Sequence, residues 1–239
     1  MELSRNSLRV KLFADGADFT GMIEMASKPF ISGLTTNPTL MKKAGVTDYE
    51  KFAKEVLNEI QDKPISFELF SDDLQEMKRQ AKKIASWGNN IFVKVPITNS
   101  FGASTQSVVE ALTQDGIKVN VTAVMTPRQV NEIVQSLNPE IESYVSVFAG
   151  RIADTGRDPV PIMRDCLNLL AMNLKSELIW ASPRELLNVI QAHEIGCHII
   201  TATSEILNKV NLIGRNLEEY SLETVKMFSD DAKNAGYTI

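Results

Sequence analysis

The stretch ISFELFSDDLQEMKRQAKKIASWGNNIFVKVPIT (residues 65–98) contains one complete strand–helix–strand pattern. It opens with an apolar run typical of a strand (65–70) and continues with an amphipathic segment that begins at Ser71 and Asp72. A second β-rich run, NIFVKVPIT (90–98), follows directly. Strands joined through a helix lie parallel in a sheet, because the helical crossover returns the chain to the same end. The stretch therefore predicts one βαβ unit of a parallel sheet.

The same pattern recurs along the whole chain. Short apolar runs rich in Val, Ile, Phe and Thr occur eight times, at VKLFAD (10–15), ISGLTTN (31–37), ISFELF (65–70), NIFVKVPIT (90–98), VNVTAV (119–124), YVSVFAGRI (144–152), ELIWAS (177–182) and HIITAT (198–203). Amphipathic segments separate them, among them 47–61, 126–137, 159–174 and 182–196. Eight strands in alternation with helices predict a parallel sheet that closes into a barrel. We therefore expect one α/β domain over residues 1–239, a single (β/α)8 TIM barrel with an extra C-terminal helix at about 217–236.

The main alternative is an open, doubly wound parallel sheet. That fold often carries a glycine-rich phosphate loop with a GxGxxG pattern after its first strand. Here the first strand ends in Asp15-Gly16-Ala17-Asp18, which lacks that pattern. The sequence therefore favours the barrel.

The composition limits the classes of partner. The chain carries 25 Lys and Arg against 30 Asp and Glu, and this net charge of -5 argues against nucleic acid or an anionic membrane, since both need a basic surface. A small phosphorylated substrate stays compatible, because two or three arginines can form a phosphate site on an acidic protein. No signal-peptide pattern or membrane-length apolar run occurs, so a cytoplasmic protein is expected. Cys166 and Cys197 lack metal-site spacing and are expected to be free, buried thiols.

In a barrel of this kind the active site lies at the carboxyl ends of the strands. The polar residues found within or after the expected strands are Asp15, Thr35, Thr36, Asn37, Glu68, Lys94, Asn120, Thr122, Ser146, Arg151, Ser182, Arg184, Thr201 and Thr203. We expect the site to be built from this set.

Lys94 is the most informative of these residues. It stands in the apolar run IFVKVPIT, although lysine is among the residues that are least often fully buried. One interpretation is a lysine at a strand edge whose charge reaches solvent. The other is an amine that is kept from water, since burial favours the neutral form, which attacks carbonyl groups and forms an imine. A protonated imine withdraws electrons and makes cleavage of a neighbouring carbon–carbon bond feasible.

Imine chemistry needs groups that move protons, and Asp15 and Glu68 are the candidates. Asp15 has an alternative interpretation as a turn or capping residue after the first strand. Glu68 lies between apolar neighbours in SFELF, where a buried carboxylate needs a partner. Its simplest partner is Lys94, in a structural ion pair.

Arg151 and Arg184 follow late strands, where barrels often bind phosphate. Ser182 and Arg184 are expected at the start of the helix at 182–196, whose first amide groups would add to an anion site. A single arginine at such a place is best interpreted as a surface residue. Two arginines and a serine at the same end of late strands favour a phosphate site.

Together, GLTTNPTL, IFVKVPIT, VNVTAV, YVSVFAGRI and WASPRE resemble, in this order and spacing, the motifs of the transaldolase family. The resemblance covers about residues 9–205, and the chain length is similar to that of the small branch, which includes fructose-6-phosphate aldolases and compact transaldolases. It implies an enzyme of carbohydrate metabolism in the pentose phosphate pathway that acts on sugar phosphates. It also implies that no metal or organic cofactor is needed, and that the chain assembles into homo-oligomers, as pentamers or decamers.

The resemblance implies a role for each matching position. Lys94 would form a Schiff base with C2 of a ketose, and Asp15 would take the proton of the C4 hydroxyl as the C3–C4 bond breaks. Glu68 and Thr122 would hold a water during imine formation. The positions implied in substrate binding are Thr36, Asn37, Asn120, Ser146, Phe148, Arg151, Ser182 and Arg184. Within this set the asparagines would hold the dihydroxyacetone hydroxyls, and the arginines would clamp the phosphate together with the serine at 182.

The implied reaction transfers a dihydroxyacetone unit from fructose 6-phosphate or sedoheptulose 7-phosphate to erythrose 4-phosphate or glyceraldehyde 3-phosphate. The alternative within the family is a fructose-6-phosphate aldolase, a lyase that needs no acceptor sugar. Aldolase members tend to carry glutamine at the position of Glu68 and tyrosine at that of Phe148, so both residues favour transaldolase. A barrel that only binds or scaffolds is a third alternative, but none of the reactive positions is missing.

The C-terminal stretch has an apolar face with no further strand to cover. Its members are Leu217, Tyr220, Leu222, Val225 and Phe228. We expect this face to mediate assembly with further copies of the chain.

Overall fold

The computed structural model describes residues 4–238. Between Arg9 and Asn208, eight parallel strands close into a barrel in which each strand pairs with its neighbours in the sequence. The strands are β1 (Lys11–Asp15), β2 (Ile31–Thr35), β3 (Ile65–Glu68), β4 (Ile91–Pro96), β5 (Val119–Val124), β6 (Ser143–Val147), β7 (Ser176–Trp180) and β8 (Ile199–Thr203). This closed sheet confirms the predicted (β/α)8 barrel and excludes the open, doubly wound sheet.

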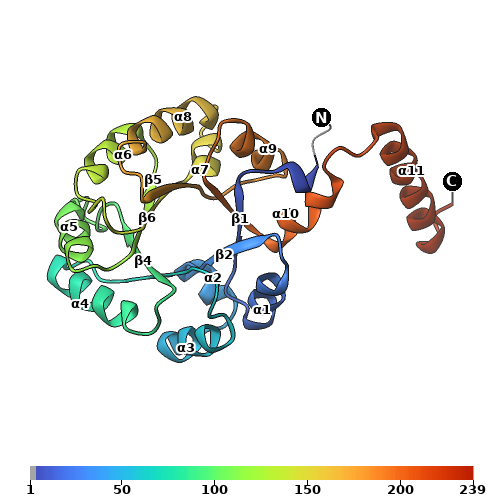
Figure 1. Ribbon diagram of the computed structural model, residues 1–239. Coiled ribbons are helices and arrows are strands. Elements are labelled where there is room, and N and C mark those ends of the chain that lie inside the picture. Colours follow the sequence, from blue (N-terminus) through green and yellow to red (C-terminus); the bar gives the residue numbers. More distant parts are fainter. Residues whose placement is uncertain (1–3, 239) are drawn as a thin grey trace. The chain divides into compact units, whose positions relative to one another are not determined.

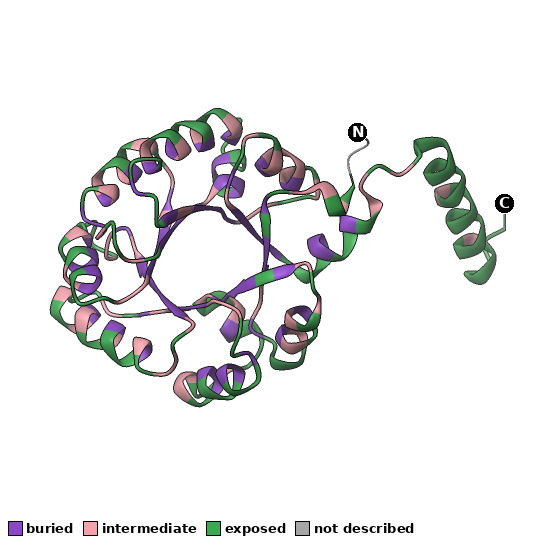
Figure 2. Cartoon of the chain, viewed as in Figure 1, coloured by how far each residue is buried: buried purple, intermediate pink, exposed green. Residues whose placement is uncertain are grey.

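Helices that follow the strands surround the barrel (Figure 1). They are α1 (Phe19–Ser27), α2 (Pro38–Lys43), α3 (Tyr49–Glu59), α4 (Leu74–Ala85), α5 (Gln106–Gln114), α6 (Pro127–Val134), α7 (Ala149–Ala153), α8 (Pro159–Leu170), α9 (Leu187–Glu194) and α10 (Ser204–Asn208). The strands are largely buried, whereas the helices expose their outer faces (Figure 2). In α3, for example, Phe52 and Val56 are buried, and Asp48 caps the helix by accepting a hydrogen bond from Lys51 N. The helical period of the apolar residues therefore locates the faces that pack on the barrel.

Side chains fill the amino-terminal half of the barrel interior. Phe13, Phe92 and Tyr144 pack together there, and the last two stack with ring centroids 3.9 Å apart. Because successive side chains of a strand alternate between its two faces, the residues two positions later point into the same interior, nearer the carboxyl end. Those residues are Asp15, Lys94 and Ser146. Phe13, Phe92 and Tyr144, here called the apolar plug, therefore lie beneath this layer of polar side chains.

Two predicted boundaries at this polar end were wrong. The run at 144–152 was expected to be one strand, but β6 ends at Val147 and α7 begins at Ala149. The chain turns there because Gly150 packs on backbone, and a Cβ at this position would lie only 1.5 Å from the carbonyl oxygen of Ser182. Arg151 consequently lies in a helix and not at a strand end.

The second correction concerns the helix expected at 182–196, since α9 begins only at Leu187. Ser182 has a positive φ of 58°, which helical residues do not adopt. The side chain of Asn188 accepts hydrogen bonds from the backbone N–H groups of Arg184 and Glu185. These amides are therefore occupied, and the predicted helix N-terminus at Ser182 is absent.

Residues 4–8 and 209–238 form a second compact unit. It contains the short 3-10 helices η1 (Arg5–Ser7) and η2 (Lys209–Leu212) and the long helix α11 (Leu217–Asn234). Arg5 Nη1 donates to Asn211 Oδ1, 3.1 Å away. Helix α11 has no buried residue, as Figure 2 shows.

Two further expectations concern the described residues as a whole. Cys166 and Cys197 are buried and free, as predicted. Within residues 4–238, none of the helices combines the length and the apolar character that a membrane crossing requires.

Candidate active site

A cavity of about 320 Å³ opens at the carboxyl ends of the strands. Of the twelve residues to which the resemblance assigns a role, the structure brings nine together in its lining: Asp15, Asn37, Glu68, Lys94, Thr122, Ser146, Phe148, Arg151 and Ser182. The other three, Thr36, Asn120 and Arg184, do not line it. Thr35 and Thr201, two of the other polar residues at the strand ends, also line it, whereas Thr203 does not. Most of the candidate residues therefore lie in one cavity wall.

Lys94 lies in the wall of the cavity with only 5% of its surface exposed. Its Nζ donates a hydrogen bond to the carbonyl oxygen of Thr36 at 2.8 Å and lies 3.3 Å from Glu68 Oε2. The two side chains meet because Lys94 and Glu68 are paired residues of adjacent strands. The interpretation of Lys94 as a solvent-facing lysine is therefore wrong, and the ion pair expected between the two is present.

Two of the residues outside the lining lie directly behind it. The hydroxyl of Thr36 donates to the carbonyl oxygen of Ser66, so its side chain stabilises the strand pairing while its own carbonyl holds Lys94. Asn120 is fully buried; its amide donates to Ser66 Oγ at 3.0 Å, and its Oδ1 accepts from Ser146 Oγ at 2.7 Å. Both side chains bond here to the protein itself, and their contact with substrate stays a prediction.

Asp15 ends β1 and accepts a hydrogen bond from Thr35 Oγ1 at 2.8 Å. The Thr35 hydroxyl lies 2.5 Å from that of Thr201, so a short chain of hydroxyls fixes the carboxylate. Burial raises the pKa of Asp15, outweighing the nearby charge of Lys94 and the Thr35 hydrogen bond, which lower it. The cap of α1 is Asp18, so the alternative interpretation of Asp15 as a helix cap is wrong.

Thr122 contributes a hydroxyl that has no hydrogen-bond partner among residues 4–238, although it is buried. Leaving a buried hydroxyl unpaired costs about 1–3 kcal/mol. The pairing register of β5 and β6 shifts between Val121 and Val124, and Ala123 has a positive φ of 60°. This irregular strand aims Thr122 and Ala123 into the cavity. Sequence reasoning missed Ala123, because an alanine carries no chemical signal.

Asn37 lines the cavity and also caps α2, where its Oδ1 accepts from Leu40 N at 3.0 Å. Pro38 follows at the first helical position, where its missing N–H costs no hydrogen bond. The cap orients the side chain with its oxygen toward the helix. The Nδ2 donors of Asn37 have no partner among the described residues and remain for a ligand.

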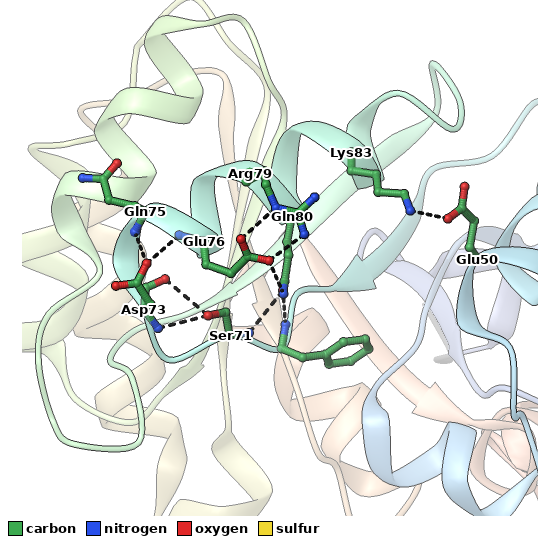
Figure 3. Close-up of polar contacts among 9 residues, drawn as sticks. Glu50, Ser71, Asp73, Gln75, Glu76, Arg79, Gln80 and Lys83 are labelled. Carbon is green, nitrogen blue, oxygen red and sulfur yellow. Dashed lines mark hydrogen bonds and ion pairs between the residues drawn. The ribbon is translucent and has the colours of Figure 1, made fainter.

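The segment after Glu68 is held by side chains from two helices. Gln80 Oε1 of α4 accepts from the backbone N–H groups of Phe70 and Ser71, at 2.9 and 3.2 Å (Figure 3). Tyr49 of α3 donates its hydroxyl to the carbonyl oxygen of Glu68 at 2.8 Å. Asp73 caps α4, in place of the predicted start at Ser71 and Asp72. Neither Gln80 nor Tyr49 could have been found from the sequence, because their partners are backbone groups.

The two arginines of the predicted phosphate site come from the segments that follow β6 and β7. Arg151 in α7 lines the cavity, has no hydrogen bond or ion pair among the described residues, and lies 5.9 Å from the ring centroid of Phe148. Arg184 instead pairs with Asp154, its Nε donating to Oδ1 at 2.9 Å and its Nη2 to Oδ2. Of the predicted phosphate clamp, Arg151 and Ser182 therefore lie in the cavity wall and Arg184 lies beside it.

The site offers a buried amine, two carboxylates, an unpaired hydroxyl and an arginine within one cavity. This combination suits attack of the amine on a carbonyl with proton transfer to and from neighbouring carboxylates. In the part of the chain that the structure describes, no three His, Cys, Asp or Glu side chains gather closely enough to hold a metal ion.

Known proteins are similar to this chain over most of its length. Residues 12–239 match the family model described as Transaldolase/Fructose-6-phosphate aldolase. A "Probable transaldolase" of Thermoanaerobacter sp. (strain X514) is 33% identical over 96% of this chain and 100% of its own length. Another, of Sulfurihydrogenibium sp. (strain YO3AOP1), is 34% identical over 83% of this chain and 87% of its own.

Solved structures resemble the fold at low sequence identity. A putative dihydrodipicolinate synthase family protein from Coccidioides immitis superposes with a TM-score of 0.59 at 13% identity, covering 99% of this chain and 79% of that one. KGPDC from Streptococcus mutans gives a TM-score of 0.57 at 12% identity, over 87% of this chain and 93% of that one. These structures bear on the barrel alone. The match over nearly the whole chain, together with the cavity around Lys94, shows that the protein belongs to the transaldolase/fructose-6-phosphate aldolase family.

Proposed function

We propose that the protein is a transaldolase that transfers a dihydroxyacetone unit between sugar phosphates through a Schiff base on Lys94. The observation that carries this proposal is the buried Lys94 amine, 3.3 Å from Glu68 in a cavity that Asp15 also lines. Burying a lysine costs folding free energy, so a buried lysine in a cavity wall favours a functional role. The donors would be fructose 6-phosphate or sedoheptulose 7-phosphate, and the acceptors erythrose 4-phosphate or glyceraldehyde 3-phosphate.

The reaction begins with imine formation. Glu68 accepts a proton from the Lys94 ammonium, and the neutral amine attacks C2 of the ketose. Loss of the C2 oxygen as water gives the protonated imine. The unpaired hydroxyl of Thr122 lies in the same wall and suits a water that carries protons between the carbinolamine and Glu68.

Carbon–carbon cleavage follows. Asp15 takes the proton of the C4 hydroxyl, the C3–C4 bond breaks, and its electrons move into the imine to give an enamine while the aldose leaves. The enamine then attacks the aldehyde carbon of the acceptor, and Asp15 returns the proton to the new hydroxyl oxygen. Hydrolysis of the imine releases the product ketose and restores Lys94.

Two residues favour transfer over simple cleavage. Release of free dihydroxyacetone needs water to protonate and hydrolyse the enamine before an acceptor arrives, so the placement of water decides the outcome. Phe148 lines the cavity without a hydroxyl that would position such a water. Glu68 is engaged with Lys94 as an ion pair, which glutamine at that position would not form.

The test measures release of glyceraldehyde 3-phosphate from fructose 6-phosphate, with and without erythrose 4-phosphate. Release that depends on erythrose 4-phosphate supports the transferase. Equal release in its absence would identify a fructose-6-phosphate aldolase and refute the argument from Glu68 and Phe148. Failure of borohydride to trap substrate on the protein would favour a barrel without catalysis.

We also infer that α11 mediates assembly of the chain into a homo-oligomer. Its apolar side chains remain exposed, with Leu217 at 78% and Phe228 at 62%. Exposed apolar faces of this kind commonly mark contacts with another protein. Light scattering on the full chain and on a chain truncated after residue 215 tests the inference, and an unchanged mass on truncation would refute it.

A further inference from the structure

Asp154 joins two segments that follow different strands. It caps the carboxyl end of α7, the helix that carries Arg151, and it binds Arg184 in the segment between β7 and α9. The contact is bidentate, because Nε and Nη2 of Arg184 each donate to a different oxygen of the carboxylate. A fork of this kind sets the orientation of the guanidinium as well as its distance.

The backbone of Arg184 is fixed independently of its side chain. Its N–H donates to Asn188 Oδ1 at 2.7 Å. Two residues earlier, Ser182 lies in the cavity wall and packs its backbone against Gly150 of α7. Both ends of Arg184 are thus anchored close to the cavity, even though the side chain does not line it.

A guanidinium has five N–H donors, and Asp154 uses two of them on one edge. The Nη1 group has no partner among the described residues. Arg151, on the same helix as Asp154, lies in the cavity wall and raises the local positive charge. The hydrogen bonds from Arg184, more than the charge of Arg151, lower the pKa of Asp154, so the carboxylate stays ionised.

We propose that Asp154 is a positioning residue that presents the free Nη1 edge of Arg184 to a phosphate group held by Arg151 and Ser182. The inference rests on the proposed function, in which the substrates are sugar phosphates. The carboxylate separates two cations that would otherwise repel each other, and it keeps Arg184 in place before phosphate arrives. Binding then costs less side-chain entropy than it would with a free arginine.

A purely structural ion pair predicts a different result. The side chains of Asp154 and Arg184 are both about half exposed, at 51% and 50%. Exposed pairs contribute little to folding, because water and salt screen their charges. An effect on phosphate binding without an effect on unfolding therefore separates positioning from a structural role.

The test compares Asp154→Asn with a matched control, Asp115→Asn. Asp115 also caps a helix at its carboxyl end, that of α5, and pairs with Lys82 of α4 at 2.8 Å, with side chains 50% and 59% exposed. Neither of these helices carries a residue of the cavity lining. The measurements are KM and kcat with erythrose 4-phosphate and with unphosphorylated glyceraldehyde as acceptors. Binding of inorganic phosphate, followed by its effect on thermal unfolding, gives a readout that needs no turnover.

For Asp154→Asn we expect KM for erythrose 4-phosphate and the Kd of inorganic phosphate to rise about tenfold. The kcat, the KM for glyceraldehyde and the unfolding temperature without phosphate should match those of the control. In an Arg184→Ala background the Asp154 substitution should have no further effect, because its action passes through Arg184. Unchanged or tighter phosphate binding, or an equal rise of KM for both acceptors, would overturn the proposal.

The two proposals fail in different ways. If the unaltered protein transfers no dihydroxyacetone but binds phosphate in a manner that depends on Asp154, the reaction is wrong and the positioning role stands. If it transfers dihydroxyacetone and Asp154→Asn changes nothing, the positioning role alone is wrong.

Discussion

The candidate site has two parts that the protein builds in different ways. The first, called the lysine end, consists of Lys94, Glu68, Asp15 and Thr122 in the cavity wall. The second, called the arginine end, consists of Arg151 and Ser182 in the wall and of the Arg184–Asp154 ion pair outside the lining. In the ion pair of the lysine end the side chains are 6% and 18% exposed, whereas in that of the arginine end they are 50% and 51% exposed. Charges interact strongly where water is excluded and weakly where it is present. The lysine end is therefore suited to shifting protons and the arginine end to recognising a charged group.

The backbone elements that carry the two groups of residues differ as well. Barrel strands hold the lysine end, and Lys94 meets Glu68 because the two are paired residues of adjacent strands. A short helix and an irregular segment hold the arginine end, through the contact of Gly150 with Ser182. Reacting groups need close placement, whereas a phosphate ligand tolerates arginines that adjust on binding. The comparison predicts large catalytic effects at the first end and effects on binding at the second.

The largest effect is expected from Lys94→Met. Without the amine no imine forms, so kcat should fall by about 10⁴-fold or more. Borohydride in the presence of fructose 6-phosphate should label the unaltered protein and not the variant, as read by mass spectrometry. Lys118→Met is the control, because Lys118 lies over Phe92 at the apolar plug and outside the cavity lining. More than a hundredth of the original turnover in Lys94→Met would remove this residue from the mechanism.

Asp15→Asn should reduce kcat/KM by about 10²- to 10⁴-fold, the usual range for a lost general base. Because burial raises the pKa of Asp15, the acid limb of kcat/KM in the unaltered protein should lie above the ordinary aspartate range near pH 4. An acid limb that persists in the variant would assign the titration to another group.

Asp15→Asn should lower activity, but it should not lower the stability of the fold. A folded-state pKa above the unfolded value adds stability below the unfolded pKa, and this contribution is lost as the pH rises through the folded pKa. Neutral pH lies above the ordinary pKa of aspartate, so this titration lowers the stability there, and Asp15→Asn removes the cost. Urea unfolding at pH 7 should show the variant to be at least as stable as the original. A clear loss of stability would mean that the carboxylate holds the fold together.

Gly150→Ala should disrupt the backbone contact between Gly150 and Ser182 that holds the arginine end. A Cβ at Gly150 would lie 1.5 Å from a backbone oxygen, and backbone cannot move aside as a flexible side chain can. We expect a loss of about 3 kcal/mol or more in the free energy of unfolding, measured with urea. Gly16→Ala is the control, because a Cβ there meets no atom within 4 Å. Equal stability of the two variants would contradict the close approach.

The smallest effect is expected from Arg151→Met. Loss of a charge-assisted hydrogen bond to phosphate should raise KM for phosphorylated substrates about 10- to 100-fold, with little change in kcat. Arg157→Met is the control, since Arg157 follows on the same segment but bonds only to Thr155 among the described residues. A fall in kcat comparable to that of Asp15→Asn would show that the two ends do not divide chemistry from recognition.

The sequence alone determined the barrel and the lysine end. Alternating apolar runs and amphipathic segments report which local faces are buried, and eight such units close a sheet. The two-residue period of strands then places Asp15 and Lys94 above Phe13 and Phe92. The unusual position of a lysine in an apolar strand was itself a signal, and the structure places that lysine in the cavity wall.

Only the tertiary structure decided how the remaining candidates are used. Thr36 contributes its carbonyl and not its hydroxyl to the site, Asn120 supports Ser146 from behind, and Arg184 is held by Asp154. Each of these arrangements depends on hydrogen bonds between residues far apart in the chain. The start of α7 depends on a backbone contact between Gly150 and Ser182. Local periodicity reports the burial of a segment but not its distant partners, so these features could not be predicted before the barrel brought the segments together.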